Sequence, residues 1–433
     1  METICCKKRF TKTSLELHWP HGLSCMLPVP PRNVATGGSR LERILNQGIE
    51  RGSLRVHWPR GEQRTFGAGR PEAELQVNDH RAPARVLADP EFMLGQTYMD
   101  GGWSTPDLRR LLAVLMANFA HQPPRPARRM VLQMIRPLQQ WNRRAASLRN
   151  VAHHYDLDEQ LFRRFLDSDL QYSCAYWPAG ETDLEAAQAH KRALIRRKLC
   201  LQPGQTVLDI GCGWGGLAIE LAERADARVV GLTLSREQAR VARQRVRERG
   251  LDDQVDIRLQ DYRDVPERFD RIVSVGMFEH VGVGYYNAYF RGVRDHLQPD
   301  GVALIHTIGR LGRPGVTNPW IRRHIFPGGY IPALSEMLAA VERNDLVSTD
   351  VEVLRLHYAY TLAEWFARFQ AVRDEVLAEK GERFCRMWEF YLALSEAAFH
   401  HRGLAVFHVQ LARDHTAVPV TRDYLLEAES PGN

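Results

Sequence analysis

Hydrophobic and polar residues alternate over short stretches in the first third of the chain. Between residues 52 and 88, four such runs are separated by turns rich in Gly, Pro, Asn and Asp. The runs are residues 54–58, 64–69, 73–78 and 84–87. Alternation between turn signals is typical of β-strands, so a small β-rich module is predicted. Helices are predicted on either side of it, at 41–48, 90–99 and 105–120, the last capped by Ser104 or Thr105.

A different pattern begins near residue 200, where short apolar runs alternate with longer stretches of helical period. The predicted strands are 206–210, 228–232, 255–259, 269–275, 302–306 and 405–412. The predicted helices are 215–224, 235–249 (capped by Ser235), 285–297, 364–378 and 382–400. Strands that alternate with helices predict an α/β fold with a doubly wound parallel sheet. We therefore expect a disordered tail at 1–38, an N-terminal domain at 39–150 and an α/β domain at 151–433.

Several classes of protein are excluded by composition. The chain has no run of ~18 apolar residues that could cross a bilayer. Its first residues lack the apolar stretch of a secretory signal, which predicts a cytoplasmic protein. The seven cysteines show no repeated Cys-x-x-Cys pair, so no metal site is predicted and a reducing compartment is favoured.

The net charge of +6 is unevenly distributed. Residues 1–150 hold 23 Lys and Arg against 12 Asp and Glu, a net charge of +11, whereas the rest of the chain has −5. From Arg109 to Tyr155 there are nine Arg and no acidic residue. A basic front half predicts a polyanionic partner, either nucleic acid or an anionic membrane. The Arg-rich segment fits an amphipathic helix on lipid headgroups, and equally a helix packed on the next domain with a solvated Arg face.

The most informative motif is VLDIGCGWGG at 207–216, where a predicted strand ends and a helix begins. Its glycines, Gly211 and Gly213 among them, allow a tight turn and close approach of a ligand to the backbone. A dinucleotide site would place an acid about 20 residues later, but that position reads GLTLS at 231–235. Asp209 instead precedes the loop, where a carboxylate can bind an ammonium group. This arrangement favours S-adenosylmethionine over NAD, with Asp261 binding the adenine amino group and Tyr262 stacking on the ring.

Motifs along the last two thirds of the chain resemble the cyclopropane-fatty-acid-phospholipid synthase family, which includes the mycolic acid cyclopropane synthases. The matching strings are HYDLDEQLFRRFLDSDLQYSCAYW (154–177), LDIGCGWGGLA (208–218), VVGLTLSREQ (229–238), VGMFEHVGVGYY (275–286), LIHTIG (304–309), WIRRHIFPGGYIP (320–332), HYAYTL (357–362) and FCRMWEFYL (384–392). The resemblance implies the S-adenosylmethionine-dependent methyltransferase fold, with a seven-stranded sheet whose last strand is antiparallel. The N-terminal third resembles, more loosely, the lipid-binding domain of the bacterial members.

The resemblance also implies an activity. Members of the family add a methylene from S-adenosylmethionine to the cis double bond of an acyl chain in a phospholipid, which gives a cyclopropane ring and S-adenosylhomocysteine. Transfer of the methyl group to an alkene makes a carbocation, and loss of a proton from the new methyl then closes the ring. The site must therefore exclude water and hold a base. Aromatic side chains in the matched motifs can stabilise the cation or simply form the core.

Particular residues are implied by the same motifs. The base is a bound bicarbonate ion, with Cys174, Glu279, His306, Tyr358 and the backbone N–H of Ile308 as its ligands. Cys385 is a candidate for a direct role, although the mechanism offers no obvious step for a nucleophilic thiol. The cofactor would be bound by Tyr172, Ser173, Asp209, Gly211, Gly213, Thr233, Leu234, Gln238, Asp261 and Tyr262.

Because the resemblance implies a phospholipid substrate, the polyanionic partner of the basic front half is expected to be an anionic phospholipid surface rather than nucleic acid. The expected protein is cytoplasmic, peripherally attached to the inner face of the membrane, and a homodimer as its relatives suggest. Three alternatives stay open: a lipid methyltransferase that leaves a methyl or methylene branch, a small-molecule N- or C-methyltransferase, and a non-catalytic lipid- or nucleic-acid-binding protein.

Overall fold

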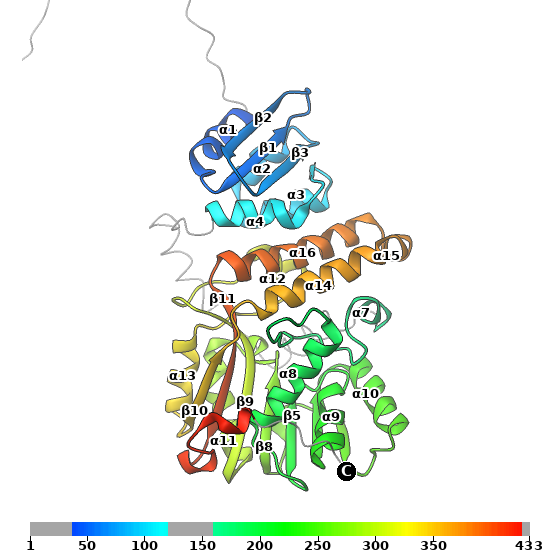
Figure 1. Ribbon diagram of the computed structural model, residues 1–433, viewed down its shortest axis with the longest axis vertical. Helices are drawn as coiled ribbons and strands as arrows, with labels where there is room; N and C mark the ends of the chain where they lie inside the picture. The colour runs from blue at the N-terminus through cyan, green and yellow to red at the C-terminus, as the bar shows by residue number, and fades with distance from the viewer. Residues whose placement is uncertain (1–36, 120–158, 427–433) are drawn as a thin grey trace, which may run out of the picture.

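The computed structural model describes residues 37–119 and 159–426, which form two sheets joined by a layer of helices (Figure 1). Residues 1–36 of the predicted tail, most of the Arg-rich segment and the predicted boundary near residue 150 lie outside these residues, whereas Gly37 and Gly38, predicted as the end of the tail, begin a helix. The first sheet has the strand order β2-β1-β3-β4. Its strands are β1 (Gly52–His57), β2 (Gln63–Ala68), β3 (Glu72–Val77) and β4 (Trp103–Ser104).

Helices flank this small sheet. They are α1 (Gly37–Gly48), α2 (Ala82–Ala88), α3 (Pro90–Met99) and α4 (Leu108–Phe119). The predicted strand at 84–87 was wrong, because these residues lie in α2. Pro83 stands in the first turn of α2, where its fixed φ suits a helix and its missing N–H costs nothing. The predicted cap of α4 was also wrong: Asp107 Oδ1 accepts the N–H of Arg110 at 2.9 Å, so the helix begins after Asp107.

The second sheet has seven strands in the order β10-β11-β9-β8-β5-β6-β7. They are β5 (Thr206–Ile210), β6 (Arg228–Thr233), β7 (Val255–Leu259), β8 (Phe269–Val275), β9 (Leu297–Arg310), β10 (Val347–Val353) and β11 (Leu404–Ala412). All six predicted strands are confirmed, and β10 is the one that the prediction missed. The last strand, β11, runs antiparallel to both its neighbours, β9 and β10, while the pairs from β9 to β7 are parallel.

Helices cover both faces of this sheet, as a doubly wound fold requires. Val207 of β5 packs with α9 (Gly216–Ala225) and α10 (Arg236–Glu248) on one face. Its neighbour Leu208 packs with α11 (Tyr286–His296) and α13 (Leu334–Glu342) on the other. Adjacent residues of a strand point to opposite faces, which is why both are apolar. Ser235 caps α10 as predicted, since its hydroxyl accepts the N–H of Gln238 at 3.2 Å.

Three further helices lie between the two sheets (Figure 1). They are α14 (His357–Ala371), α15 (Arg373–Lys380) and α16 (Glu382–His401). The single helix predicted at 364–378 was wrong, because the chain breaks at Val372 without a Gly or Pro to signal it. α16 packs against α14 on one side and against α3 and α4 on the other. Gly95 of α3 has no room for a Cβ, which would lie 2.5 Å from Phe390 and 2.7 Å from Trp320.

The remaining helices complete the supports of the site. α7 (Glu159–Phe165) and α8 (Leu184–Lys198) precede the seven-stranded sheet, and α12 (Pro319–His324) follows β9. Short 3₁₀ turns cover Tyr262–Asp264, Phe278–His280, Val283–Tyr285, His415–Ala417 and Arg422–Leu425. Within residues 37–119 and 159–426, every helix is too short or too polar to cross a bilayer.

Candidate active site

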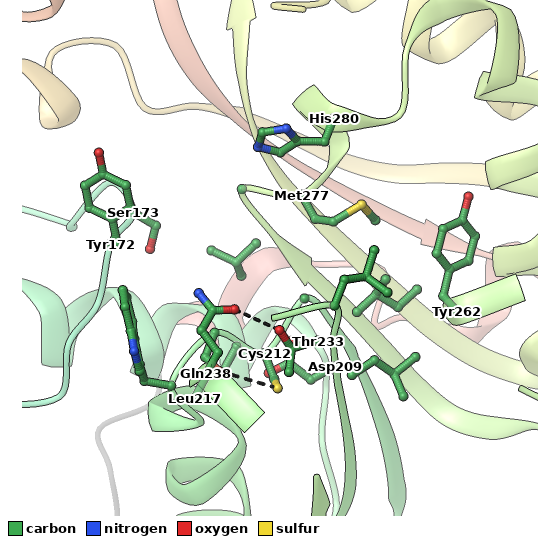
Figure 2. A pocket seen from close by; sticks show the side chains of 18 of the residues that line it. Tyr172, Ser173, Asp209, Cys212, Leu217, Thr233, Gln238, Tyr262, Met277 and His280 are labelled. Atoms are coloured by element: carbon green, nitrogen blue, oxygen red, sulfur yellow. Dashed lines mark hydrogen bonds between the residues drawn. The ribbon is translucent and has the colours of Figure 1, made fainter. Parts of the chain in front are cut away.

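A pocket opens at the carboxyl ends of β5, β6, β7 and β8, the edge at which doubly wound sheets bind their ligands. The ten residues predicted to bind a cofactor all line this pocket. Tyr172 and Ser173 lie on one side of it and Tyr262 on the opposite side, with Asp209 and Thr233 at the base between them (Figure 2). These residues come from four separate segments of the chain, so the fold assembles the site. We refer to this site as the cofactor pocket.

The glycine loop after β5 has the backbone that its sequence predicts. Gly211 and Gly213 have φ values of +93° and +54°, in the region that residues with a side chain rarely adopt. A Cβ on Gly211 would also lie 3.1 Å from the side chain of Met277. The loop returns to the sheet through the N–H of Cys212, which donates to the carbonyl of Leu232 at 2.8 Å. The glycines therefore leave an open cradle at the start of α9.

Asp209 is the polar group at the base of the cofactor pocket. Its side chain is 1% exposed, and neither carboxylate oxygen has a hydrogen-bond partner among the described residues. Burial raises the pKa of Asp209 to about 7, against the opposing effect of the Lys191 charge. A buried carboxylate without a partner is costly, so this group fits the ammonium end of a ligand that carries an amino acid.

The next wall is formed after β6. Thr233 Oγ1 donates to Gln238 Oε1 at 2.8 Å, which fixes the orientation of the amide. The amide nitrogen of Gln238 is therefore turned away from Thr233 (Figure 2). Its N–H groups suit a hydroxyl acceptor such as a ribose. Leu234 supplies an apolar contact beside them.

Asp261 and Tyr262 form the far wall, after β7. The Asp261 carboxylate accepts the backbone N–H of Arg263 at 3.0 Å and pairs with its guanidinium at 2.6 Å, which holds the carboxylate in place. The Tyr262 ring meets Tyr289 edge to face at 5.5 Å, and Arg263 lies 5.6 Å from its centre. Burial raises the pKa of Tyr262 to about 12, so its hydroxyl stays protonated. An aromatic ring beside a carboxylate suits an aminopurine, and stacking on it stays a prediction.

A second group of residues lies beside the cofactor pocket, where the loop after β8 meets the end of β9. Glu279 stands between Met277 and His280, which both line the pocket. The N–H of Ile308 donates to Glu279 Oε1 at 2.7 Å, whereas Oε2 is buried with no hydrogen-bond partner in the described ranges. Burial raises the pKa of Glu279 to about 7. Glu279 and Ile308 are thus brought together as the family resemblance implies.

His306 lies two residues before Ile308 on β9, so the two side chains share one face of the sheet. Its Nδ1 is 2.7 Å from Nε2 of His408, which stands directly opposite on β11. Both rings are buried, and burial lowers the pKa of each well below its usual range, so both are neutral. One hydrogen is therefore shared between these two nitrogens. We call Glu279, His306, Ile308 and His408 the acid–histidine cluster.

Cys174 and Tyr358 are brought toward each other through α14. Thr361 lies three residues after Tyr358 on this helix, and its hydroxyl accepts the N–H of Ala175 at 3.1 Å. The Cys174 thiol is fully buried and donates to the carbonyl of Ala175 at 3.3 Å. Burial raises its pKa, so it stays a thiol and can only donate weakly. Tyr358 packs edge to face against Trp365.

Cys385 lies elsewhere, in the first turn of α16. The charges acting on its thiol are those of Arg373, Glu389 and Glu382, from α15 and α16. Burial raises its pKa, which lowers its reactivity. None of the interactions resolved for it in residues 37–119 and 159–426 involves the other predicted catalytic residues. A direct role for Cys385 stays an untested prediction that the geometry does not favour.

Three residues at the site were not predicted from the sequence. Lys191 of α8 is fully buried and donates to Gln171 and Ser173 in the pocket wall. His280 lines the pocket, and burial lowers its pKa to about 4. His408 reads as one polar residue on an apolar strand. The packing of α8 places Lys191 at the site, and the pairing of β11 with β9 places His408 there.

A seven-stranded sheet with one antiparallel strand, a glycine loop after its central strand and acids after the neighbouring strands defines the class of Rossmann-like methyltransferases. Residues 142–409 match the family of mycolic acid cyclopropane synthetases. The chain is also 39% identical over 375 residues to cyclopropane-fatty-acyl-phospholipid synthase of Escherichia coli K12, which covers 86% of this chain and 93% of that protein. The chain therefore belongs to the mycolic acid cyclopropane synthetase family.

Other relatives support the same family and fold. Tuberculostearic acid methyltransferase UfaA1 of Mycobacterium tuberculosis is 38% identical over 364 residues, 78% of this chain and 84% of that protein. Among solved structures, cyclopropane synthase MmaA2 of the same organism is 34% identical with a TM-score of 0.59, covering 61% of this chain and 98% of that one. Mycolic acid cyclopropane synthase CmaA1, complexed with SAH and CTAB, is 36% identical with a TM-score of 0.58, over 61% and 97%. The predicted fold is confirmed.

Proposed function

We propose that the protein transfers a methylene from S-adenosylmethionine to the cis double bond of an unsaturated acyl chain in a membrane phospholipid, forming a cyclopropane ring. The observation that carries the proposal is the position of Glu279. Its carboxylate is buried beside the pocket that fits the cofactor, and one of its oxygens lacks a partner among the described residues. Relatives named for cyclopropane formation support it, including the Escherichia coli enzyme.

Each part of the cofactor has its own binding residues. Asp209 holds the ammonium end of the cofactor, Gln238 its ribose, and Asp261 with Tyr262 its adenine. The buried aromatic side chains exclude water, which a carbocation would otherwise capture. When bound, S-adenosylmethionine supplies an electrophilic methyl group.

We propose bicarbonate as the base. The ligands that the family resemblance implies fit an anion that carries a hydroxyl: Glu279 can accept the hydroxyl hydrogen, while the Ile308 N–H, His306 and Tyr358 can donate. A general base accelerates proton transfer typically 10²–10⁴-fold when it is within hydrogen-bond reach. The protein's part is to orient this anion so that an unprotonated oxygen faces the substrate.

The test is product analysis. The purified protein is incubated with vesicles of unsaturated phospholipid and methyl-labelled S-adenosylmethionine, and the lipid is examined by mass spectrometry and proton NMR. A ring methylene signal is expected. A methylated acyl chain without that signal would instead identify a branch-forming enzyme, like the relative named tuberculostearic acid methyltransferase. A parallel incubation contains a small amine in place of the vesicles. Label on the amine, with none on the lipid of the first incubation, would identify a small-molecule methyltransferase.

The polyanion partner has its own test. We propose that the basic front half binds anionic phospholipid, which places the protein on the inner membrane surface. Co-sedimentation with anionic vesicles, neutral vesicles and RNA across a salt series separates the possibilities. Binding to anionic vesicles that weakens with salt is expected, and stronger retention on RNA would contradict the proposal. Sedimentation equilibrium on the same sample tests the expected homodimer.

A further inference from the structure

The wall of the cofactor pocket at residues 167–173 is held by largely buried charges from α8 and α10. Arg192 Nη2 binds Asp169 at 3.0 Å and Arg245 Nη2 binds the same carboxylate at 2.6 Å. Gln188 Nε2 donates to the backbone carbonyls of Gln171 and Ser173 at 3.2 and 3.0 Å. These contacts fix the backbone of the wall, and Lys191 takes no part in them.

Lys191 acts on side chains rather than on the backbone. Its Nζ donates to Gln171 Oε1 at 2.6 Å and to Ser173 Oγ at 2.9 Å, and its own side chain is completely buried. A lysine ammonium donates and does not accept. The Ser173 hydroxyl that accepts from it must therefore direct its own hydrogen elsewhere, and Ser173 lines the cofactor pocket.

The same constraint applies to Gln171. Because Oε1 faces Lys191, the amide nitrogen must face the other way, and Nε2 indeed lies where a Cβ on Gly216 would come within 2.4 Å of it. Gly216 begins α9, so this nitrogen is beside the glycine loop. Both residues line the pocket, and each has an acceptor atom turned toward Lys191 and its donor turned away from it.

We propose that Lys191 is a positioning residue that sets the hydrogen-bond polarity of Ser173 and Gln171, so that both donate to the carboxylate of the cofactor's amino-acid end. Asp209 receives the ammonium of the same end on the other side. The two charges of an amino acid are then met by an acid and by a pair of donors oriented by the buried Lys191 amino group. Lys191 is close enough to Asp209 for its charge to oppose the rise in the pKa of that carboxyl.

The experiment compares two ligands that differ in one group, S-adenosylhomocysteine and its decarboxylated form, which keeps the ammonium. Calorimetry is expected to show that Lys191→Met weakens S-adenosylhomocysteine about 10–100-fold, the range of hydrogen bonds to a charged group. The decarboxylated ligand should change less than about threefold. In turnover, the KM for S-adenosylmethionine should rise by a larger factor than kcat falls.

A matched control is available on the same helix. Lys198 is also fully buried, but its ammonium pairs with Glu352 at 2.6 Å, at the far edge of the sheet from the pocket. Lys198→Met should lower the melting temperature yet leave the affinity of both ligands unchanged. If Lys191→Met does not give folded protein, Lys191→Gln carries the test, because an amide keeps hydrogen-bonding capacity in the buried site.

The role of Ser173 is tested by a double-mutant cycle. Ser173→Ala should show the same selective loss for the carboxylate-bearing ligand, and adding it to Lys191→Met should cost less than the sum of the two single changes. Equal weakening of both ligands by the Lys191 variants would overturn the proposal, since Lys191 would then only support the wall. Unchanged affinity for S-adenosylhomocysteine would overturn it as well.

Discussion

The cofactor pocket and the acid–histidine cluster lie side by side, and each holds a buried carboxylate oxygen without a partner among the described residues, on Asp209 and Glu279. They differ in the groups around that carboxylate. In the cofactor pocket, Asp209 has two buried oxygens with no hydrogen-bond partner in the described chain. In the cluster, the Ile308 N–H is already bonded to Glu279, and His306 to His408. The pocket gains hydrogen bonds when a ligand arrives, whereas the cluster must exchange one. Because net hydrogen-bond energies are small, we expect an anion to bind the cluster weakly and the cofactor to bind the pocket tightly.

Glu279→Gln should separate the two regions most sharply. An amide cannot hold the hydroxyl of the anion in the same way, so turnover should fall about 10²–10⁴-fold, the contribution of a positioned base. Affinity for S-adenosylhomocysteine should change less than about threefold, since Glu279 does not line the cofactor pocket. Single-turnover kinetics and calorimetry measure the two effects. Loss of cofactor binding with unchanged chemistry would show that our role for Glu279 is wrong.

Asp209→Asn is the converse change. Removing the carboxylate should weaken S-adenosylhomocysteine about 10–100-fold through loss of a charge-assisted hydrogen bond. It should also stabilise the ligand-free protein at pH 8. The folded pKa of about 7 lies above the ordinary value of 3.8, so the carboxyl's contribution is most favourable below pH 4 and is lost as pH rises to 7.

The stability effect of Asp209→Asn follows from the size of that shift. About three pKa units set an upper bound of roughly 4 kcal/mol, at ~1.36 kcal/mol per unit. Melting temperatures of the two proteins should therefore converge below pH 4 and diverge at pH 8, with the variant higher. A variant that melts lower at pH 8 would mean that Asp209 has a partner in the folded protein.

His408→Leu should have a smaller effect, confined to the cluster. Without His408 the ring of His306 loses the hydrogen bond that fixes its tautomer, and kcat should fall about tenfold, as for outer partners that orient functional histidines. His408→Gln keeps a hydrogen-bonding group at this position and should retain more activity than the Leu variant. Equal activity of the wild type and both variants would show that His306 needs no partner.

Tyr262→Phe should change least. The ring, not the hydroxyl, is expected to contact adenine, so S-adenosylhomocysteine affinity should stay within about twofold. Tyr262→Ala should cost about 3–10-fold, the range of aromatic contacts beyond simple burial. A larger loss for the Phe variant would assign the hydroxyl a direct hydrogen bond instead.

Some features of this comparison could be read from local sequence. Gly211 and Gly213 predict a turn with a backbone conformation that only glycine adopts readily. Asp209 lies at the end of the apolar run that precedes this turn. Motifs of this kind involve neighbours in the chain, so spacing alone locates them. The strand predicted at 84–87 shows the limit, because four alternating residues cannot be distinguished from one turn of a helix that begins at Ala82. The break at Val372 is another, since no Gly or Pro marks it.

Long-range pairings could not be read in the same way. His408 lies 102 residues from His306, and it meets that ring because β11 is inserted antiparallel between β9 and β10. Lys191 belongs to a helix whose sequence is rich in charge and reads as a surface element. Its burial depends on the packing of α8 against the wall at 167–173, which no local pattern encodes.

The sequence by itself therefore determined the class of fold, six of the seven strands of the large sheet, the glycine loop and ten of the residues that line the cofactor pocket. These follow from periodicity and from motifs whose members are close in the chain or match a known family. The tertiary structure alone decided which polar groups are satisfied and which are not. That outcome depends on burial and on partners from distant elements, and it is what distinguishes a pocket ready for its ligand from a cluster that must first exchange a bond.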